Sequence, residues 1–200
     1  MNAAGQFAIA WVSSHPAATI PELDPEKSVF VQWYDAAGVS TGDEVLAHNY
    51  VKDAQESPSL GMDAAGKFVI AWQSINQDGS TWGVYARQFL ADKTPVQADE
   101  FLVNETTDQL QRLAGVGVRA DGSFVIAWES TSLAVDDGSS TDIYRREYFA
   151  DGTSDGHENL VNTWTGGPQV SPVVARTTTG NYGIFWMGQG FSHIDGVHGR

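Results

Sequence analysis

The feature that most constrains this chain is an apolar, strand-like segment that occurs four times. Each copy begins two residues after a glycine and ends in a tryptophan. The four tryptophans are Trp11, Trp72, Trp128 and Trp186. Successive tryptophans are 61, 56 and 58 residues apart. A nearly constant period in this range is typical of a repeat array, in which every unit is one supersecondary motif.

The rest of the unit repeats as well and predicts four short strands. In the second unit we expect them at 57–62, 68–72, 84–89 and 100–103. β-branched and aromatic residues dominate these segments, and turn residues separate them. A four-stranded unit of this size cannot bury both of its faces alone, whereas sheets packed face to face can. The sequence therefore predicts an all-β chain, a β-propeller-like array of four-stranded blades with about three and a half repeats of roughly 58 residues.

The repeat also sets the expected division of the chain. We predict a single array with units at 1–54, 55–110, 111–168 and an incomplete 169–200. The first unit lacks the strand before its glycine turn, and the last ends inside a strand. We expect either a piece of a longer protein or copies that associate to complete a ring. The first is favoured, since an open strand edge is prone to mispairing.

Composition excludes several classes of partner. The chain has 25 acidic and 11 basic residues and a net charge of −14, so nucleic acid and anionic membrane surfaces would repel it. No apolar run approaches the roughly 20 residues that span a bilayer, which argues against membrane insertion. The absence of cysteine excludes disulfides and thiolate metal sites. The acidity fits a solvated surface and cation binding alike.

Four motifs carry a resemblance to a known repeat. They are FVIAWxS, Val-Tyr-Ala-Arg-Gln-Phe, Ala-Asp-Gly-Thr and Glu-x-Leu-Val-Asn, most regular over 57–176. They resemble repeats of large secreted bacterial proteins that often also carry RTX-type calcium-binding or cadherin-like modules. The resemblance implies an extracellular or cell-surface location and an adhesin-like setting, and it implies no particular reaction. The first unit departs from the pattern, because Gln32 stands where later units have arginine.

Two acidic loops are candidate calcium sites. Asp78 lies in one, and Asp136, Asp137 and Asp142 lie in the other, among serines and glycines. Calcium takes six to eight oxygen ligands and tolerates irregular loops. Neither loop has EF-hand or nonapeptide calcium-repeat spacing, and Asp-Gly is also ordinary turn chemistry. Calcium is therefore the one cofactor we expect, with turn formation as the alternative.

Residues that keep the period are interpreted as framework, and those that break it as candidates for binding. Arg87 and Arg146 share one repeat position, and glutamates share another on the next strand, which predicts a cross-strand ion pair. Trp33, Trp82 and Trp164 break the period and are expected to be exposed. Trp82 and Trp164 are the candidate ligand-binding rings, since indoles stack on sugars; single exposed aromatics also occur without a role.

No catalytic motif emerges from the sequence. It contains no nucleophile elbow, phosphate loop or dinucleotide fingerprint, and the adjacent Asp136 and Asp137 would not face each other across a substrate. We therefore predict a non-enzymatic β-propeller module of a secreted or cell-surface bacterial protein, serving adhesion, structural spacing or assembly. Its expected partners are other protein chains, copies of itself, and glycans. The alternatives are a carbohydrate-binding, lectin-like propeller and a propeller hydrolase, and fold alone does not choose among these functions.

Overall fold

The structure, a computed structural model, describes residues 1–14, 27–131, 141–176, 181–189 and 195–200. The described residues form strands only, with no helix long and apolar enough to cross a membrane. The strands are β1 (Phe7–Ser13), β2 (Ser28–Tyr34), β3 (Val45–Leu46), β4 (Gln55–Met62), β5 (Phe68–Ile75), β6 (Trp82–Phe89), β7 (Phe101–Leu102), β8 (Gln111–Val118), β9 (Phe124–Ser130), β10 (Asp142–Tyr148), β11 (Asn159–Leu160), β12 (Gln169–Arg176), β13 (Tyr182–Gln189) and β14 (Asp195–Gly199).

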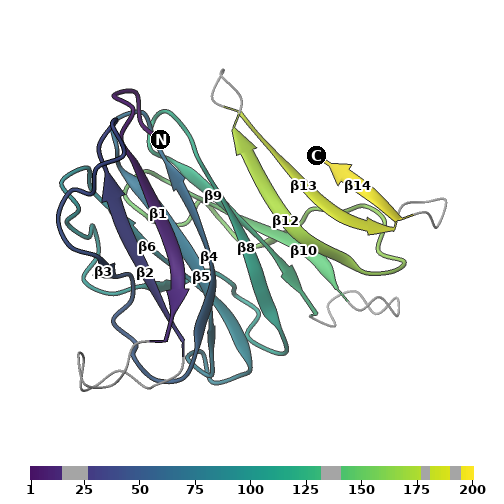
Figure 1. The fold of residues 1–200 in the computed structure, drawn as a ribbon. Helices are drawn as coiled ribbons and strands as arrows, with labels where there is room; N and C mark the ends of the chain where they lie inside the picture. The colour runs from purple at the N-terminus through teal and green to yellow at the C-terminus, as the bar shows by residue number, and fades with distance from the viewer. Residues whose placement is uncertain (15–26, 132–140, 177–180, 190–194) are drawn as a thin grey trace.

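These strands form four antiparallel sheets that follow one another along the chain (Figure 1). We call them blade 1 (β1–β3), blade 2 (β4–β7), blade 3 (β8–β11) and blade 4 (β12–β14). Within each blade every strand pairs with the next one in sequence. Blades 1 and 4 lie at the two ends of the array, and the sheets do not close into a ring. The predicted all-β, propeller-like array of blades is confirmed.

The interior of the array lies between neighbouring blades, because strands such as β5 are buried on both faces. Side chains alternate along a strand. Phe68, Ile70 and Trp72 therefore pack against blade 1, while Val69 and Ala71 pack against blade 3. The recurring large rings fill the space between blades, as their period predicts.

A spacing of 17 residues separates a glutamine from the repeated tryptophan in blades 2, 3 and 4, and in two of these blades one buried hydrogen bond joins the pair. The indole Nε1 of Trp128 donates to Gln111 Oε1 at 3.1 Å, and that of Trp186 donates to Gln169 Oε1 at 2.8 Å. A buried indole N–H normally needs such an acceptor. In blades 3 and 4 the repeated glutamine thus joins the first two strands through the tryptophan, whereas in blade 2 neither Trp72 Nε1 nor Gln55 Oε1 has a hydrogen-bond partner among the described residues.

The predicted Arg–Glu ion pair within a blade was wrong. The repeated arginines reach back to main-chain carbonyls of the preceding blade: Arg87 Nη1 to Ala47 O, Arg146 Nη1 to Val103 O and Arg200 Nη1 to Val161 O. The repeated glutamates also reach back, since Glu100 and Glu158 accept hydrogen bonds from backbone N–H groups of the preceding blade. Both residue types therefore join blades to each other, which sequence periodicity alone could not reveal.

A third repeated contact closes the outer edge of blades 1, 2 and 3. Asn104 Oδ1 accepts the Val84 N–H at 2.8 Å, and His48 takes the same role in blade 1, with Nε2 accepting the Val29 N–H at 3.2 Å. His48 Nδ1 lies 2.7 Å from Tyr50 O, so Nδ1 carries the proton and the ring is neutral. Burial lowers the pKa of His48 to about 4.

Candidate functional site

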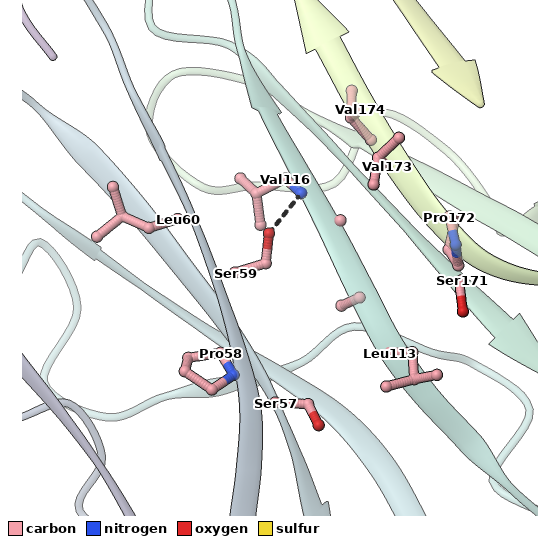
Figure 2. A pocket seen from close by; sticks show the side chains of 12 residues that line it. Ser57, Pro58, Ser59, Leu60, Leu113, Val116, Ser171, Pro172, Val173 and Val174 are labelled. Atoms are coloured by element: carbon pink, nitrogen blue, oxygen red, sulfur yellow. Dashed lines mark hydrogen bonds between the residues drawn. The ribbon is translucent and has the colours of Figure 1, made fainter. Parts of the chain in front are cut away.

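A cavity lies where the first strands of three blades meet. Its volume is about 450 Å³, and β4, β8 and β12 form its walls (Figure 2). The same four repeat positions line it in each blade, at residues 57–60, 113–116 and 171–174. Their side chains are apolar or carry a hydroxyl, and none of them is ionisable. We call this space the axial cavity.

A β-bulge interrupts each wall strand at the cavity. The pairing register shifts there in β4, β8 and β12. Ser57, Leu113 and Ser171 adopt left-handed φ values of 53°, 51° and 54° at this point. Such a conformation costs a non-glycine residue on the order of 1–3 kcal/mol and persists where its surroundings hold it in place. A bulge bends its strand and changes the direction of nearby side chains, so the three equivalent bulges together shape the axial cavity.

Close approach of the strands fixes the spacing of these walls. Ser59 Oγ accepts a hydrogen bond from the Val116 N–H at 3.2 Å, joining β4 to β8 (Figure 2). On the other side of β8, a Cβ added to Gly115 would lie 2.9 Å from Pro172 O. Only glycine permits this approach, and a larger residue would push β12 away from β8.

One buried carboxylate touches the cavity wall from behind. Glu129, on β9, is 1% exposed. Its Oε1 accepts a hydrogen bond from Arg112 Nε at 2.5 Å, and its Oε2 accepts the N–H of Ser171, the bulge residue of β12, at 3.1 Å. Gln73 holds the equivalent place in blade 2, where its Oε1 accepts the Leu113 N–H at 3.2 Å. Burying a carboxylate costs free energy unless polar partners such as these replace its lost hydration.

A second carboxylate lies at the same level of the array. Glu56 directly precedes the bulge of β4, and Arg112, the partner of Glu129, directly precedes the bulge of β8. Glu56 is partly exposed and forms an ion pair with Lys27 at 2.7 Å. Sequence reasoning missed both carboxylates. The available signal for Glu129 was the residue after each repeated tryptophan, which is Val12, Gln73, Glu129 and Met187 in the four units.

A separate charged network lies at the opposite end of β9 and joins blade 3 to blade 4. Burial by itself raises the pKa of Glu147, but hydrogen bonds from Tyr182, Arg119 and Arg145 outweigh it and lower that pKa to about 2. Arg119 Nη2 lies 2.6 Å from Glu147 Oε2, and its guanidinium stacks 4.6 Å from the Tyr182 ring centroid. The network is fully engaged in these contacts and forms part of the blade joint.

Two of the four acidic residues predicted to bind calcium, Asp78 and Asp142, lie in the described part of the chain. Asp78, between β5 and β6, accepts the Ser80 N–H at 3.0 Å, as in an ordinary turn. Asp142, at the start of β10, is 3% exposed and accepts from Asn162 Nδ2 at 2.6 Å. Asp136 and Asp137 lie outside the described residues. In the described part of the chain no three acidic or histidine side chains gather to hold a metal ion, and calcium stays a prediction.

The three tryptophans that break the period have different environments. The expected exposure of Trp33 was wrong, because it is 6% exposed and packs edge-on against Phe68 at 5.4 Å. Trp82 starts β6 and is half-buried. Trp164 is also half-buried, and its Nε1 donates to Gly166 O at 2.7 Å. Neither lines the axial cavity, and their predicted role in ligand binding stays a prediction.

No protein-family model and no curated protein match the chain. Solved structures resemble it over almost its full length. An endo-arabinase from Bacteroides thetaiotaomicron VPI-5482 matches 98% of this chain and 70% of its own, with 14% identity and a TM-score of 0.57. A protein of unknown function from Dyadobacter fermentans DSM 18053 matches 98% and 62%, with 11% identity and a TM-score of 0.61. An α-L-arabinofuranosidase from Lactobacillus brevis matches 96% and 64%, with 10% identity and a TM-score of 0.52.

At these identities the likeness shows the fold, and the chain spans between 62% and 70% of these three structures. The comparison nevertheless overturns the functional prediction. We expected a non-enzymatic module for adhesion, spacing or assembly, whereas the similar propellers are mostly glycoside hydrolases. The physical reason for the error is that sequence motifs report local spacing, while a propeller can assemble its reacting groups from several blades.

Proposed function

We propose that the chain is part of a glycoside hydrolase that binds its sugar substrate in the axial cavity. The observation that carries this proposal is the buried carboxylate of Glu129, which touches the cavity wall through Ser171. Arabinose-containing polysaccharides are the first substrates to test, because an endo-arabinase and an α-L-arabinofuranosidase share the fold.

Glycoside hydrolysis requires two carboxyl groups, one that donates a proton to the leaving oxygen and one that acts as base or nucleophile. We assign one of these roles to Glu56, which is partly exposed and directly precedes the wall residue Ser57. Glu129 lies behind the wall, so we assign it a positioning role: its contacts with Arg112 and with the Ser171 N–H hold the bulge of β12 in place. Both lie at the level of the bulges, on β4 and β9.

The cavity wall suits a sugar in size and chemistry. Ligand sites commonly enclose about 300–1,000 Å³ and combine apolar surface with a few polar groups. In the axial cavity Leu60, Leu113 and Val174 offer apolar surface to the C–H groups of a sugar ring. Ser57 and Ser171 place hydroxyls on opposite walls, β4 and β12, where they can hydrogen-bond sugar hydroxyls.

The test is release of reducing sugar from linear arabinan, with xylan and starch as alternative substrates. We expect Glu56→Gln to lower kcat by about 10²–10⁴-fold, the usual loss when a catalytic acid or base is removed. Glu129→Ala should lower kcat by about 10²-fold through misplacement of the wall, and Glu129→Gln should restore most of the rate, because Gln73 makes the same contact in blade 2. Asp155→Asn, at an exposed turn, is the control and should keep the wild-type rate.

Two results would overturn the proposal. One is a folded wild-type chain that releases no sugar from any of the three polysaccharides. The other is a Glu56→Gln variant that retains the wild-type kcat.

A further inference from the structure

Blade 1 exposes a face that is buried in the other blades. We define the leading face by Phe7, Ile9, Trp11 and Tyr34, which occupy the repeat positions that contact the preceding blade elsewhere. Ile9 is 48% exposed, although its equivalents in blades 2 and 3 are fully buried. Phe7 stacks on Tyr34 with ring centroids 5.0 Å apart, as the rings at an internal joint do. The face is thus ordered as a blade joint with no described element covering it.

Blade 4 exposes the opposite side of such a joint. We define the trailing face by Val173, Phe185, Met187 and Val197, which are 59%, 41%, 52% and 76% exposed. Equivalent positions in blade 2, such as Ala71 and Val84, are 0% exposed because blade 3 covers them. Four large apolar side chains on one open sheet face are typical of an interaction surface.

The residues of the trailing face differ from those of an internal joint in a specific way. Inside the array the second strand of a blade packs on the first strand of the next, β5 on β8 and β9 on β12. Ala71 and Ala127 are the small residues at this contact, where blade 4 has Phe185. A blade with its own first strand would collide with the larger Phe185 ring. Blade 1 has no first strand among the described residues and so leaves room for that ring.

The polar contacts of the internal joints are also replaced at both open faces. Gln73 and Glu129 reach the first strand of the next blade, and Met187 stands at that position in blade 4. Arg87 reaches back to the preceding blade, and Gln32 stands at that position in blade 1. Gln32 instead donates to Gly42 O within its own blade at 2.9 Å. The two open faces therefore match each other as apolar surfaces and need no polar partner from a neighbouring blade.

We propose that a second copy of this chain docks head to tail, with the trailing face of one copy on the leading face of the next. The contact continues the blade-to-blade packing of the array and joins two different surfaces, so it is heterologous. It goes beyond the proposed catalytic function, and neither proposal depends on the other.

Light scattering of the full chain over a range of concentrations tests this assembly. We expect the mass to rise with concentration from 21.6 kDa to multiples of it. Ile9→Glu on the leading face and Met187→Glu on the trailing face should each hold the chain at 21.6 kDa. An equal mixture of these two variants should form a species of two copies and nothing larger, because each variant keeps one intact face.

Val39→Glu is the matched control, since Val39 is 59% exposed on a turn outside both faces and should not change the mass. Val197→Glu repeats the trailing-face test at a side chain that is 76% exposed, where folding tolerates the charge. Three outcomes would overturn the proposal: a wild-type mass of 21.6 kDa at every concentration, single variants that assemble as the wild type does, or a mixture that stays monomeric.

Discussion

The joint between blades 2 and 3 and the open face of blade 1 present nearly the same side chains in different surroundings. Ile126 and Trp128 are fully buried at the joint, whereas Ile9 is 48% exposed and Trp11 is half-buried. The second strands that carry them have almost the same sequence. The difference teaches that in a repeat array the neighbouring blade, and not the strand itself, supplies most of the burial that stabilises each ring.

The largest expected effect comes from removing a tryptophan at the internal joint. Trp128→Ala should lower the free energy of unfolding by about 3–5 kcal/mol, because it leaves a cavity and an unpaired Gln111. Trp11→Ala should cost about 1–2 kcal/mol, since that ring is already partly solvated. Urea denaturation at low protein concentration measures both. Equal losses would refute the comparison.

The next effect is the pH dependence of the outer edge of blade 1. The pKa of His48 is about 4 in the folded chain and near its ordinary 6.5 when unfolded. Between these values the unfolded chain binds the extra proton, so stability is full above pH 6.5 and falls as the pH drops toward 4. The loss should reach about 3 kcal/mol.

His48→Asn sharpens this prediction, because Asn104 makes the same contact in blade 2 without titrating. Denaturation midpoints measured from pH 7.5 to 4 should show a shallower decline for the variant. The prediction fails if the two proteins lose stability in parallel over this range.

A smaller difference in stability is expected between variants of Arg146 and Arg200, the arginines that contact main-chain carbonyls of the preceding blade. Arg146→Gln removes contacts to Val103 O and Glu105 at an internal joint and should destabilise the chain by about 1–2 kcal/mol. Arg200→Gln removes a contact to Val161 O at the joint between blades 3 and 4, but from an exposed side chain, and should change stability by less than about 0.5 kcal/mol. Thermal melts of both variants provide the measurement, and a larger loss for Arg200→Gln would reverse the ranking.

The smallest change tests the same contrast with a single methyl group. Ile126→Val should cost about 1 kcal/mol because the removed methyl is fully packed. Ile9→Val should cost only a few tenths of that amount, since solvent already reaches the side chain. Urea midpoints at low concentration measure the difference. If the two losses were equal, the leading face would be covered in the monomer.

Local sequence predicted the strands well because the signal that forms them is local. The apolar segment at 68–72 lies within β5, and the glycine turn before it adopts a positive φ at Gly66. The site was harder to predict. Glu129 and Ser171 are 42 residues apart and meet only because blade 4 packs on blade 3. The bulge at Leu113 was equally hidden, since leucine gives no sign of a left-handed backbone.

The sequence by itself determined the repeat, the strand positions and the rings that separate the blades, because spacing and hydrophobic alternation act over a few residues. Only the tertiary structure decided that Trp33 is buried, that the repeated Arg and Glu side chains contact the preceding blade, and that three bulges enclose one cavity. These features arise from contacts between blades, and such contacts depend on which surfaces are brought together rather than on the order of residues within one strand.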